Sequence, residues 1–183
     1  NLKKLISTVA ALAITATSAF SAFAANFTDV ADTADYKVAV DNLVALGVVN
    51  GYEDGTYGPE KLITRAEASK MIVGTMGPAM MEAAEASKGS SNFTDVAGDH
   101  WASGFIAQGV SKGYINGMGD GTFAPDNNVT YAQIVKMLVC VLGYAEDAEA
   151  NGGWPNGYIN QATSLKVTDG VSAAADTAVN RGQ

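Results

Sequence analysis

The feature that most constrains this chain is an internal repeat, because the sequence near residue 55 recurs in register 66 residues later. Residues 47–67 read GVVNGYEDGTYGPEKLITRAE, and residues 113–133 read GYINGMGDGTFAPDNNVTYAQ. The same offset carries the FTDV of residues 27–30 onto the FTDV of residues 93–96. A small repeated unit cannot bury its apolar face alone, so each unit must pack on its neighbours. The repeat therefore indicates a modular binding or anchoring protein before it indicates an enzyme.

Residues 1–25 have the pattern of a secretion signal. Lys3 and Lys4 provide a basic start, an apolar run extends from Leu5 to Phe20, and residues 22–24 (AFA) have the small-x-small form that a signal peptidase accepts. The apolar run is short for a membrane span and is diluted by serine and threonine. We therefore expect a signal peptide over residues 1–25 and no membrane span after its removal.

The charge of the remaining chain excludes some classes of partner. About 158 residues follow the leader, enough for one compact domain, and they carry nine basic and 19 acidic residues, a formal charge of −10. This balance opposes binding to nucleic acid or to anionic lipid through a general basic surface. The single cysteine, Cys140, excludes an intramolecular disulfide framework. We expect no metal site, because the Asp-Gly turns lack the remaining ligand spacing of a calcium loop.

The repeat divides the secreted part into units. Thr64 and Glu67, and likewise Thr130 and Gln133, have capping-box spacing at the start of an apolar helical pattern. The sequence predicts helices over residues 33–46, 64–76, 79–87, 102–111 and 130–142. The expected boundaries are a first unit over 26–77, a linker or short helix over 78–92, a second unit over 93–144 and a partial third unit over 145–183.

The third unit is a degenerate copy of the first two. Residues 154–159 match residues 101–106 at an offset of 53, and residues 180–183 match residues 130–133 at an offset of 50, so the intervening loop is shorter. The chain stops directly after this third helix-start signal and begins without Met. We therefore expect it to be a fragment in which the third unit is truncated.

These motifs resemble those of the S-layer homology (SLH) family, whose units open with Phe-x-Asp-Val. Such units continue through a Gly-Tyr-x-Asp-Gly-Thr-Phe-x-Pro loop and close with Thr-Arg-Ala-Glu. The first unit matches the loop over residues 51–59 and carries the closing motif intact over residues 64–67. The second unit departs from the pattern at Tyr131, where the family usually has Arg, and the third unit keeps Arg181 but has lost most of its loop.

The resemblance implies a fold and a function. The fold is mainly α: a pseudo-threefold helical domain of three helix–loop–helix repeats, with the first helices forming a central bundle and the third repeat truncated. Grooves between adjacent units of such proteins bind secondary cell-wall polysaccharide attached to peptidoglycan, often bearing ketal-linked pyruvate. The implied function is a non-catalytic module that needs no cofactor and holds an exported protein on the bacterial cell wall or in its S-layer.

The resemblance also suggests glycan-binding residues. Arg65 can grip a carboxylate with its planar fork, at a helix start where free N–H groups favour an anion, and Arg181 is the second choice. Further candidates are two carboxylates for sugar hydroxyls, two glycines for a close backbone approach and two aromatic rings for stacking: Asp29, Asp95, Gly51, Gly117, Tyr52 and Trp101.

Simpler interpretations stay open for several of these residues. Asp29 and Asp95 can instead cap a turn, and Trp101 and Trp154 can instead anchor the core. Tyr131 is expected to pack in the core or between units, which would leave fewer competent grooves than units. The alternative function is a protein–protein module of an S-layer lattice with little affinity for glycan. An enzyme would need catalytic residues outside this sequence, because no pair of carboxylates stands out and the single His100 has no nucleophilic neighbour.

Overall fold

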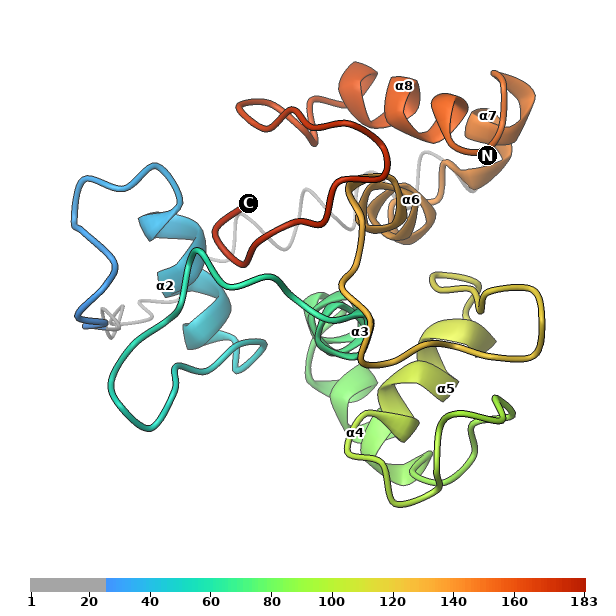
Figure 1. Cartoon of the computed structure of the whole chain (residues 1–183), viewed down its shortest axis with the longest axis horizontal. Helices are drawn as coiled ribbons and strands as arrows, with labels where there is room; N and C mark the ends of the chain where they lie inside the picture. The colour runs from blue at the N-terminus through green and yellow to red at the C-terminus, as the bar shows by residue number, and fades with distance from the viewer. Residues whose placement is uncertain (1–25) are drawn as a thin grey trace.

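The computed structural model describes residues 26–183, so the predicted signal peptide over residues 1–25 lies outside the described part. Within residues 26–183 the secondary structure consists of helices joined by loops, with isolated β-bridges but no longer strand. The prediction of a mainly α fold is confirmed. The helices, labelled as in Figure 1, are α2 (Lys37–Ala45), α3 (Arg65–Thr75), α4 (Pro78–Ala86), α5 (Ser103–Ser111), α6 (Tyr131–Val141), α7 (Ala145–Ala150) and α8 (Asn156–Ser164).

Capping boxes start the two helices that lie at the centre of the molecule. At α3, the Thr64 hydroxyl accepts the Glu67 N–H, and the Glu67 carboxylate accepts the Thr64 N–H at 2.7 Å. At α6, Thr130 and Gln133 form the same pair of bonds. Both satisfy N–H groups that a helix start leaves without intrahelical partners. The sequence therefore predicted these two starts correctly.

Other helix boundaries differ from the expectation. The first helix begins at Lys37 rather than near residue 33, because turns occupy residues 32–36. Helix α7 was not predicted; its acidic residues Glu146 and Asp147 lie in the first turn, where the helix dipole favours negative charge. No helix within residues 26–183 combines the length and apolar composition that a membrane span needs.

The second helix of each unit packs on the next unit. Helix α3 contacts α4, in the segment between the first two units, and α5 of the second unit; α6 contacts α7 and α8 of the third unit. Figure 1 shows α3 and α6 nearly end-on at the centre, with α2, the α4–α5 pair and the α7–α8 pair around them. Our expectation of a central bundle of first helices is therefore wrong, since no substantial contact joins α2, α5 and α8 in the described part of the chain. The physical reason is burial: α3 buries seven residues, whereas α2 buries only Val40.

Short backbone contacts connect each of the three units to the other two. Antiparallel bridges join Thr64 to Asn128, Thr130 to Ala178, and Leu62 to Asn180, so each segment pairs with both others. The start of α3 extends this pattern, because the Arg65 N–H donates to the Asn127 carbonyl at 2.9 Å. Equivalent bonds run from Tyr131 to Thr177 and from Arg181 to Lys61. The loop of each unit therefore accepts backbone N–H groups at the capping-box segment of another unit.

The buried apolar residues form two clusters. The larger one surrounds α3, α5, α6 and α8 and includes Phe105, Ile106 and Phe123. The smaller one lies in the first unit and contains Val30, Val40, Val48, Val49 and Tyr57. The chain returns to this smaller cluster at residues 180–183, where Asn180 and Gln183 exchange side chain–backbone hydrogen bonds in the capping-box pattern. Figure 1 shows this last segment beside α2.

Candidate functional site: two clefts between the units

Asp29 and Asp95 hold the glycine-rich loops. The two carboxylate oxygens of Asp29 accept the backbone N–H groups of Tyr57 and Gly58, both at 2.7 Å. Asp95 accepts those of Phe123 at 2.8 Å and Ala124 at 2.6 Å. In both units, the two carboxylate oxygens are therefore occupied by backbone N–H groups of the loop. We had predicted that these oxygens cap a turn or accept hydrogen bonds from a sugar. Neither carboxylate lines the clefts described below.

These bonds make the stability of the fold depend on pH. Partial burial works to raise the pKa of Asp95, but the N–H groups of Phe123 and Ala124 outweigh it and hold the pKa below its ordinary value. A lowered pKa in the folded state stabilises the fold above the ordinary pKa of about 4, and this stabilisation is lost as pH falls through the lowered value.

Asp95→Asn is therefore expected to destabilise the protein at pH 7 by about 2 kcal/mol, because an amide oxygen can replace only one of the two charged acceptors. Chemical denaturation from pH 7 to pH 2 measures this, and the gap to the wild type should shrink as pH falls. Asp126→Asn, at an exposed position on the same loop, is the control. A gap that stays constant over this range would contradict the role given to Asp95.

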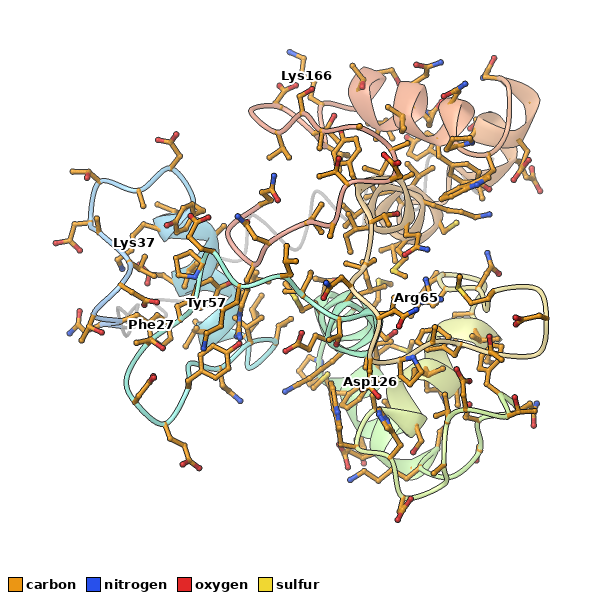
Figure 2. The ribbon with its side chains drawn as sticks, viewed as in Figure 1. Phe27, Lys37, Tyr57, Arg65, Asp126 and Lys166 are labelled. Carbon is orange, nitrogen blue, oxygen red and sulfur yellow. The ribbon has the colours of Figure 1, made fainter. Side chains whose placement is uncertain are left out.

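Gly51 and Gly117 make room for aromatic rings. A Cβ on Gly51 would lie 2.1 Å from Phe27 Cε1, and a Cβ on Gly117 would lie 2.3 Å from Phe93 Cε1. Phe27 in turn packs on Tyr57 with ring centroids 5.5 Å apart, as Figure 2 shows in the lobe of α2. The absence of a side chain at these glycines therefore serves the packing of the loop, and Gly117 also borders a cleft.

Arg65 is a buried link between the first and second units. Its residue is 3% exposed, its Nε donates to the Phe123 carbonyl at 2.8 Å, and an Nη donates to the Asn116 carbonyl at 2.9 Å. The guanidinium carbon lies 4.5 Å from the centre of the Phe123 ring. Figure 2 shows Arg65 between α3 and the lobe of α5. Burial lowers the pKa of this guanidinium and Asp95 opposes that effect.

Arg181 has an equivalent position against the first unit. Its guanidinium carbon lies 4.5 Å from the Tyr57 ring centre and 5.1 Å from that of Tyr52, and an Nη donates to the Asn50 carbonyl. The Nε of Arg181 is buried without a hydrogen-bond partner. Lys61 also packs over the Tyr52 ring, with its Nζ 3.6 Å from the ring centre. Tyr52 is therefore covered by cations and does not line either cleft.

Helix starts do not supply free donors to an anion. The Arg65 and Ala66 N–H groups donate to the carbonyls of Asn127 and Pro125, both at 2.9 Å. The N–H groups of Arg181 and Gly182 are accepted in the same way by Lys61 and Pro59. The free N–H groups that we expected at the start of α3 are therefore not available to an anion, because a neighbouring unit already accepts from them. Any recognition of an anion there falls to side chains.

Cleft A is a cavity of about 310 Å³ between the second and third units. It combines the edge of the Arg65 guanidinium with the loop of the second unit, one face of α6 and an indole from the third unit. Trp154 is 50% exposed, and Lys136 lies with its Nζ 5.5 Å from the Trp154 ring centre. The lining residues are Arg65, Tyr114, Asn116, Gly117, Met118, Gln133, Lys136, Met137 and Trp154.

Cleft B is a cavity of about 190 Å³ between the first and second units. It presents the same kinds of group: a guanidinium on an aromatic ring, a lysine from the second helix and an indole, Trp101, that is 47% exposed. The lining residues are Val48, Val49, Asn50, Ile63, Glu67, Lys70, Met71, Trp101 and Arg181.

The two clefts are related by the sequence repeat. An offset of 66 carries Asn50, Lys70 and Met71 of cleft B onto Asn116, Lys136 and Met137 of cleft A. Both indoles are half exposed, so the interpretation of Trp101 and Trp154 as core anchors is wrong. At the third equivalent position Tyr131 is 5% exposed and belongs to the larger core, as expected for a packing residue.

The structure brings together four of the predicted residues: Arg65 and Gly117 in cleft A, and Arg181 and Trp101 in cleft B. It leaves Asp29, Asp95, Gly51 and Tyr52 outside both clefts. Sequence reasoning missed the cations Lys70 and Lys136 and the indole of Trp154 as cleft residues. The repeat could have identified these residues, because the two lysines occupy equivalent positions of their units and so do the two tryptophans.

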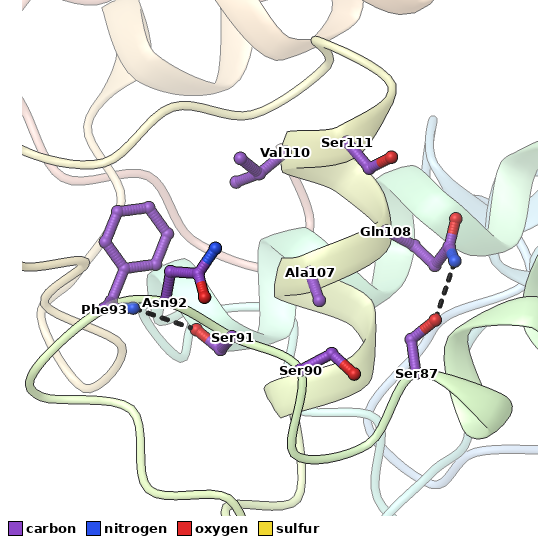
Figure 3. A pocket seen from close by; sticks show the side chains of 9 residues that line it. All are labelled: Ser87, Ser90, Ser91, Asn92, Phe93, Ala107, Gln108, Val110 and Ser111. Atoms are coloured by element: carbon purple, nitrogen blue, oxygen red, sulfur yellow. Dashed lines mark hydrogen bonds between the residues drawn. The ribbon is translucent and has the colours of Figure 1, made fainter.

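A third cavity has a different character. It measures about 320 Å³, lies beside α5 and is lined by Ser87, Ser90, Phe93, Gln108 and five other uncharged residues. Figure 3 shows the Gln108 amide donating to the Ser87 hydroxyl across its edge, at 2.7 Å. This cavity has no charged lining and arises from α4 and the linker that follows it.

His100 and Cys140 are capable of acid–base or nucleophilic chemistry, and the structure gives both a role in packing or hydrogen bonding. His100 accepts the Ala102 N–H through Nδ1 and stacks on Trp101 with ring centroids 5.8 Å apart. Burial raises the pKa of the Cys140 thiol, which keeps it protonated at neutral pH. Neither group is arranged as a general base or a nucleophile.

Comparisons with known proteins agree with this architecture. The family model described as "S-layer homology domain" matches residues 26–69 and 92–135. The chain is 36% identical over 144 residues to a "Middle cell wall protein" of Brevibacillus brevis, covering 79% of the chain and 13% of that protein. It is 35% identical over 185 residues to a "Cell surface protein" of Thermoanaerobacter kivui, covering 100% of the chain and 23% of that protein.

A third relative is a "Cellulosome-anchoring protein" of Acetivibrio thermocellus, 31% identical over 100 residues that cover 55% of the chain and 22% of that protein. The chain thus spans less than a quarter of the length of each of these relatives. Two matched domains in register with the sequence repeat, and relatives named for the cell wall and cell surface, show that the chain belongs to the S-layer homology domain family.

Proposed function

We propose that this chain is a non-catalytic anchoring module that binds acidic secondary cell-wall polysaccharide in clefts A and B. Its family membership makes it a cell-surface module of an exported bacterial protein. The finer proposal concerns the ligand, a peptidoglycan-linked polymer with carboxylate groups such as ketal-linked pyruvate. The observation that carries it is the recurrence of one guanidinium, one lysine and one half-exposed tryptophan in both clefts.

The chemistry of each cleft suits an acidic sugar. An exposed indole provides an apolar face for the C–H side of a sugar ring, and a nearby lysine provides a point charge for a carboxylate. In cleft A, Lys136 lies 4.7 Å from the Tyr158 ring centre, and the Tyr158 hydroxyl donates to Glu149 at 2.6 Å. The aromatic rings therefore hold the ammonium group close to the indole without neutralising it.

The clefts also contrast with the rest of the surface. The secreted part carries a formal charge of −10, which repels polyanions in general. Each cleft nevertheless places two of the few cations of the chain beside an indole. Such a distribution favours recognition of a carboxylate at a defined place over general attraction to anionic polymers.

Lys136→Ala is expected to weaken the binding of wall polysaccharide in cleft A about tenfold, because it removes the charge next to Trp154. Isothermal titration with polymer released from cell walls measures this. Lys112→Ala, which removes an exposed lysine at the end of α5, should leave the affinity unchanged. Equal affinities for the Lys136 variant and the wild type would remove cleft A from the proposal.

A pull-down with wall sacculi tests the proposed function as a whole. The protein should bind intact sacculi and fail to bind sacculi from which the secondary polymers have been stripped by acid. Retained binding to stripped sacculi would indicate peptidoglycan itself as the ligand and contradict the proposal.

The second candidate function is a lattice module that joins S-layer subunits through protein–protein contacts. The observation that favours it is the absence of an arginine at Tyr131, which removes one of the three equivalent guanidinium positions. Analytical ultracentrifugation separates the two. Oligomers that grow with concentration, together with no affinity for wall polymer, would favour the lattice.

A further inference from the structure

Cleft A and cleft B differ at one charged position. Glu67 lines cleft B, and the residue at the equivalent position of cleft A is Gln133. Each is the fourth residue of its capping box, so its place in the fold is fixed by the same two bonds to Thr64 or Thr130. Apart from this position, each cleft contains one arginine and one lysine. The described lining of cleft A has no carboxylate, whereas that of cleft B has one.

We infer that the residue at this position sets the preference of each cleft, so that cleft A selects anionic sugar units while cleft B discriminates less between anionic and neutral units. This inference rests on the proposed function of both clefts. Its physical basis is repulsion: a carboxylate on the ligand would lie near the Glu67 carboxylate in cleft B, and near an uncharged amide in cleft A.

Other carboxylates near the clefts do not remove this difference. Burial lowers the pKa of Arg65 and the charge of Asp95 opposes this effect, but Asp29 has the position equivalent to Asp95 in the first unit. Glu149 lies beyond Tyr158, accepts its hydroxyl, and is not among the residues that line cleft A. The Glu67 carboxylate accepts the Thr64 N–H, which spreads its charge without cancelling it.

The chain provides its own reporters, since its two tryptophans are divided between the two clefts. In Trp101→Phe the remaining indole, Trp154, reports on cleft A; in Trp154→Phe the indole of Trp101 reports on cleft B. The probes are a methyl hexoside carrying a pyruvate ketal and the same hexoside without the ketal. Fluorescence titration then gives a dissociation constant for each cleft and each probe.

The expected result is that cleft A binds the ketal about fivefold more tightly than cleft B, a ratio of the size expected for one pair of like charges that water largely screens. Glu67→Gln should remove the difference by strengthening cleft B, and Gln133→Glu should weaken cleft A by a similar factor. Both substitutions have a precedent in the chain, because each residue already completes a capping box at the other position. The neutral hexoside should show no response to either substitution, and added salt should reduce the fivefold ratio.

The outcomes separate the two claims. Equal ketal affinities that neither substitution changes would overturn the inference about Glu67 and Gln133 while leaving the proposed function intact. Indoles that respond to neither hexoside, in a protein that also fails to bind intact sacculi, would overturn the proposed function and the inference with it.

Discussion

Gly104→Ala is expected to destabilise the protein by about 3 kcal/mol, because the added methyl group would collide with the backbone of a neighbouring helix. A Cβ on Gly104 of α5 would lie 1.9 Å from the Ala84 carbonyl oxygen in α4. Backbone cannot move aside as a flexible side chain can, so α4 and α5 would have to separate. Thermal unfolding followed by circular dichroism measures the loss.

The repeat supplies a matched pair of controls. Gly157 of α8 has the same relation to α7, with its Cβ position 2.1 Å from the Ala148 carbonyl oxygen, so Gly157→Ala should behave like Gly104→Ala. The equivalent position in α2 is Val38, which is 69% exposed, and Val38→Ala should change stability little. A Gly104→Ala protein as stable as the wild type would contradict the helix packing described here.

Arg65→Ala is expected to cost about 3 kcal/mol of folding free energy, corresponding to roughly 10 °C in melting temperature. Arg65 is 3% exposed, and its removal would leave the carbonyls of Phe123 and Asn116 without these donors in a partly buried place. It would also remove the group that faces the Phe123 ring. The substitution should therefore weaken the contact between the first and second units as well as cleft A.

Arg65→Lys distinguishes structure from charge. Lysine keeps the positive charge but cannot donate in the planar two-armed geometry that reaches both carbonyls. Its melting temperature should fall between those of the wild type and the Arg65→Ala variant. A loss of glycan binding in Arg65→Ala counts as evidence for a contact to the ligand only if the variant is measured well below its melting temperature. An Arg65→Ala protein that melts with the wild type would contradict the linking role.

The sequence was most informative where a local rule acts over a few residues. The capping boxes at Thr64 and Thr130 placed the starts of α3 and α6 correctly, because their bonds join residues only three positions apart. The break at residues 77–78 and the short helix that follows were also predicted. Helix α7 was missed, because it has no counterpart in the repeated motifs, although acidic residues at a helix start are favourable.

The exchange of second helices between units could not be read from periodicity. An apolar face on α3 is equally consistent with packing on α2 or on α5, and only the structure shows that α5 is its partner. Gly104 did hold a signal, because a glycine within a predicted helix often marks a close backbone approach, and Gly157 occupies the matching position of the third unit. Val38 at the equivalent position then distinguishes the first unit from the other two.

The candidate site was predicted in part for a related reason. Family motifs direct attention to residues that recur, and residues such as Asp29 and Gly51 recur because the loop needs them. Lys70 and Lys136 lie outside the quoted motifs, yet they line the clefts because one face of α3 and one face of α6 are turned toward a neighbouring indole. Such groupings depend on contacts between units, which no single motif contains.

The most direct test of the central claim is an NMR titration of the purified protein with polysaccharide released from bacterial cell walls. The two indole N–H signals identify the clefts, since Trp101 borders cleft B and Trp154 borders cleft A. We expect both signals to shift and saturate, while the amide signals of Ser90 and Ser91 beside the uncharged cavity stay in place. Binding of the polymer with both indole signals unmoved would contradict the account.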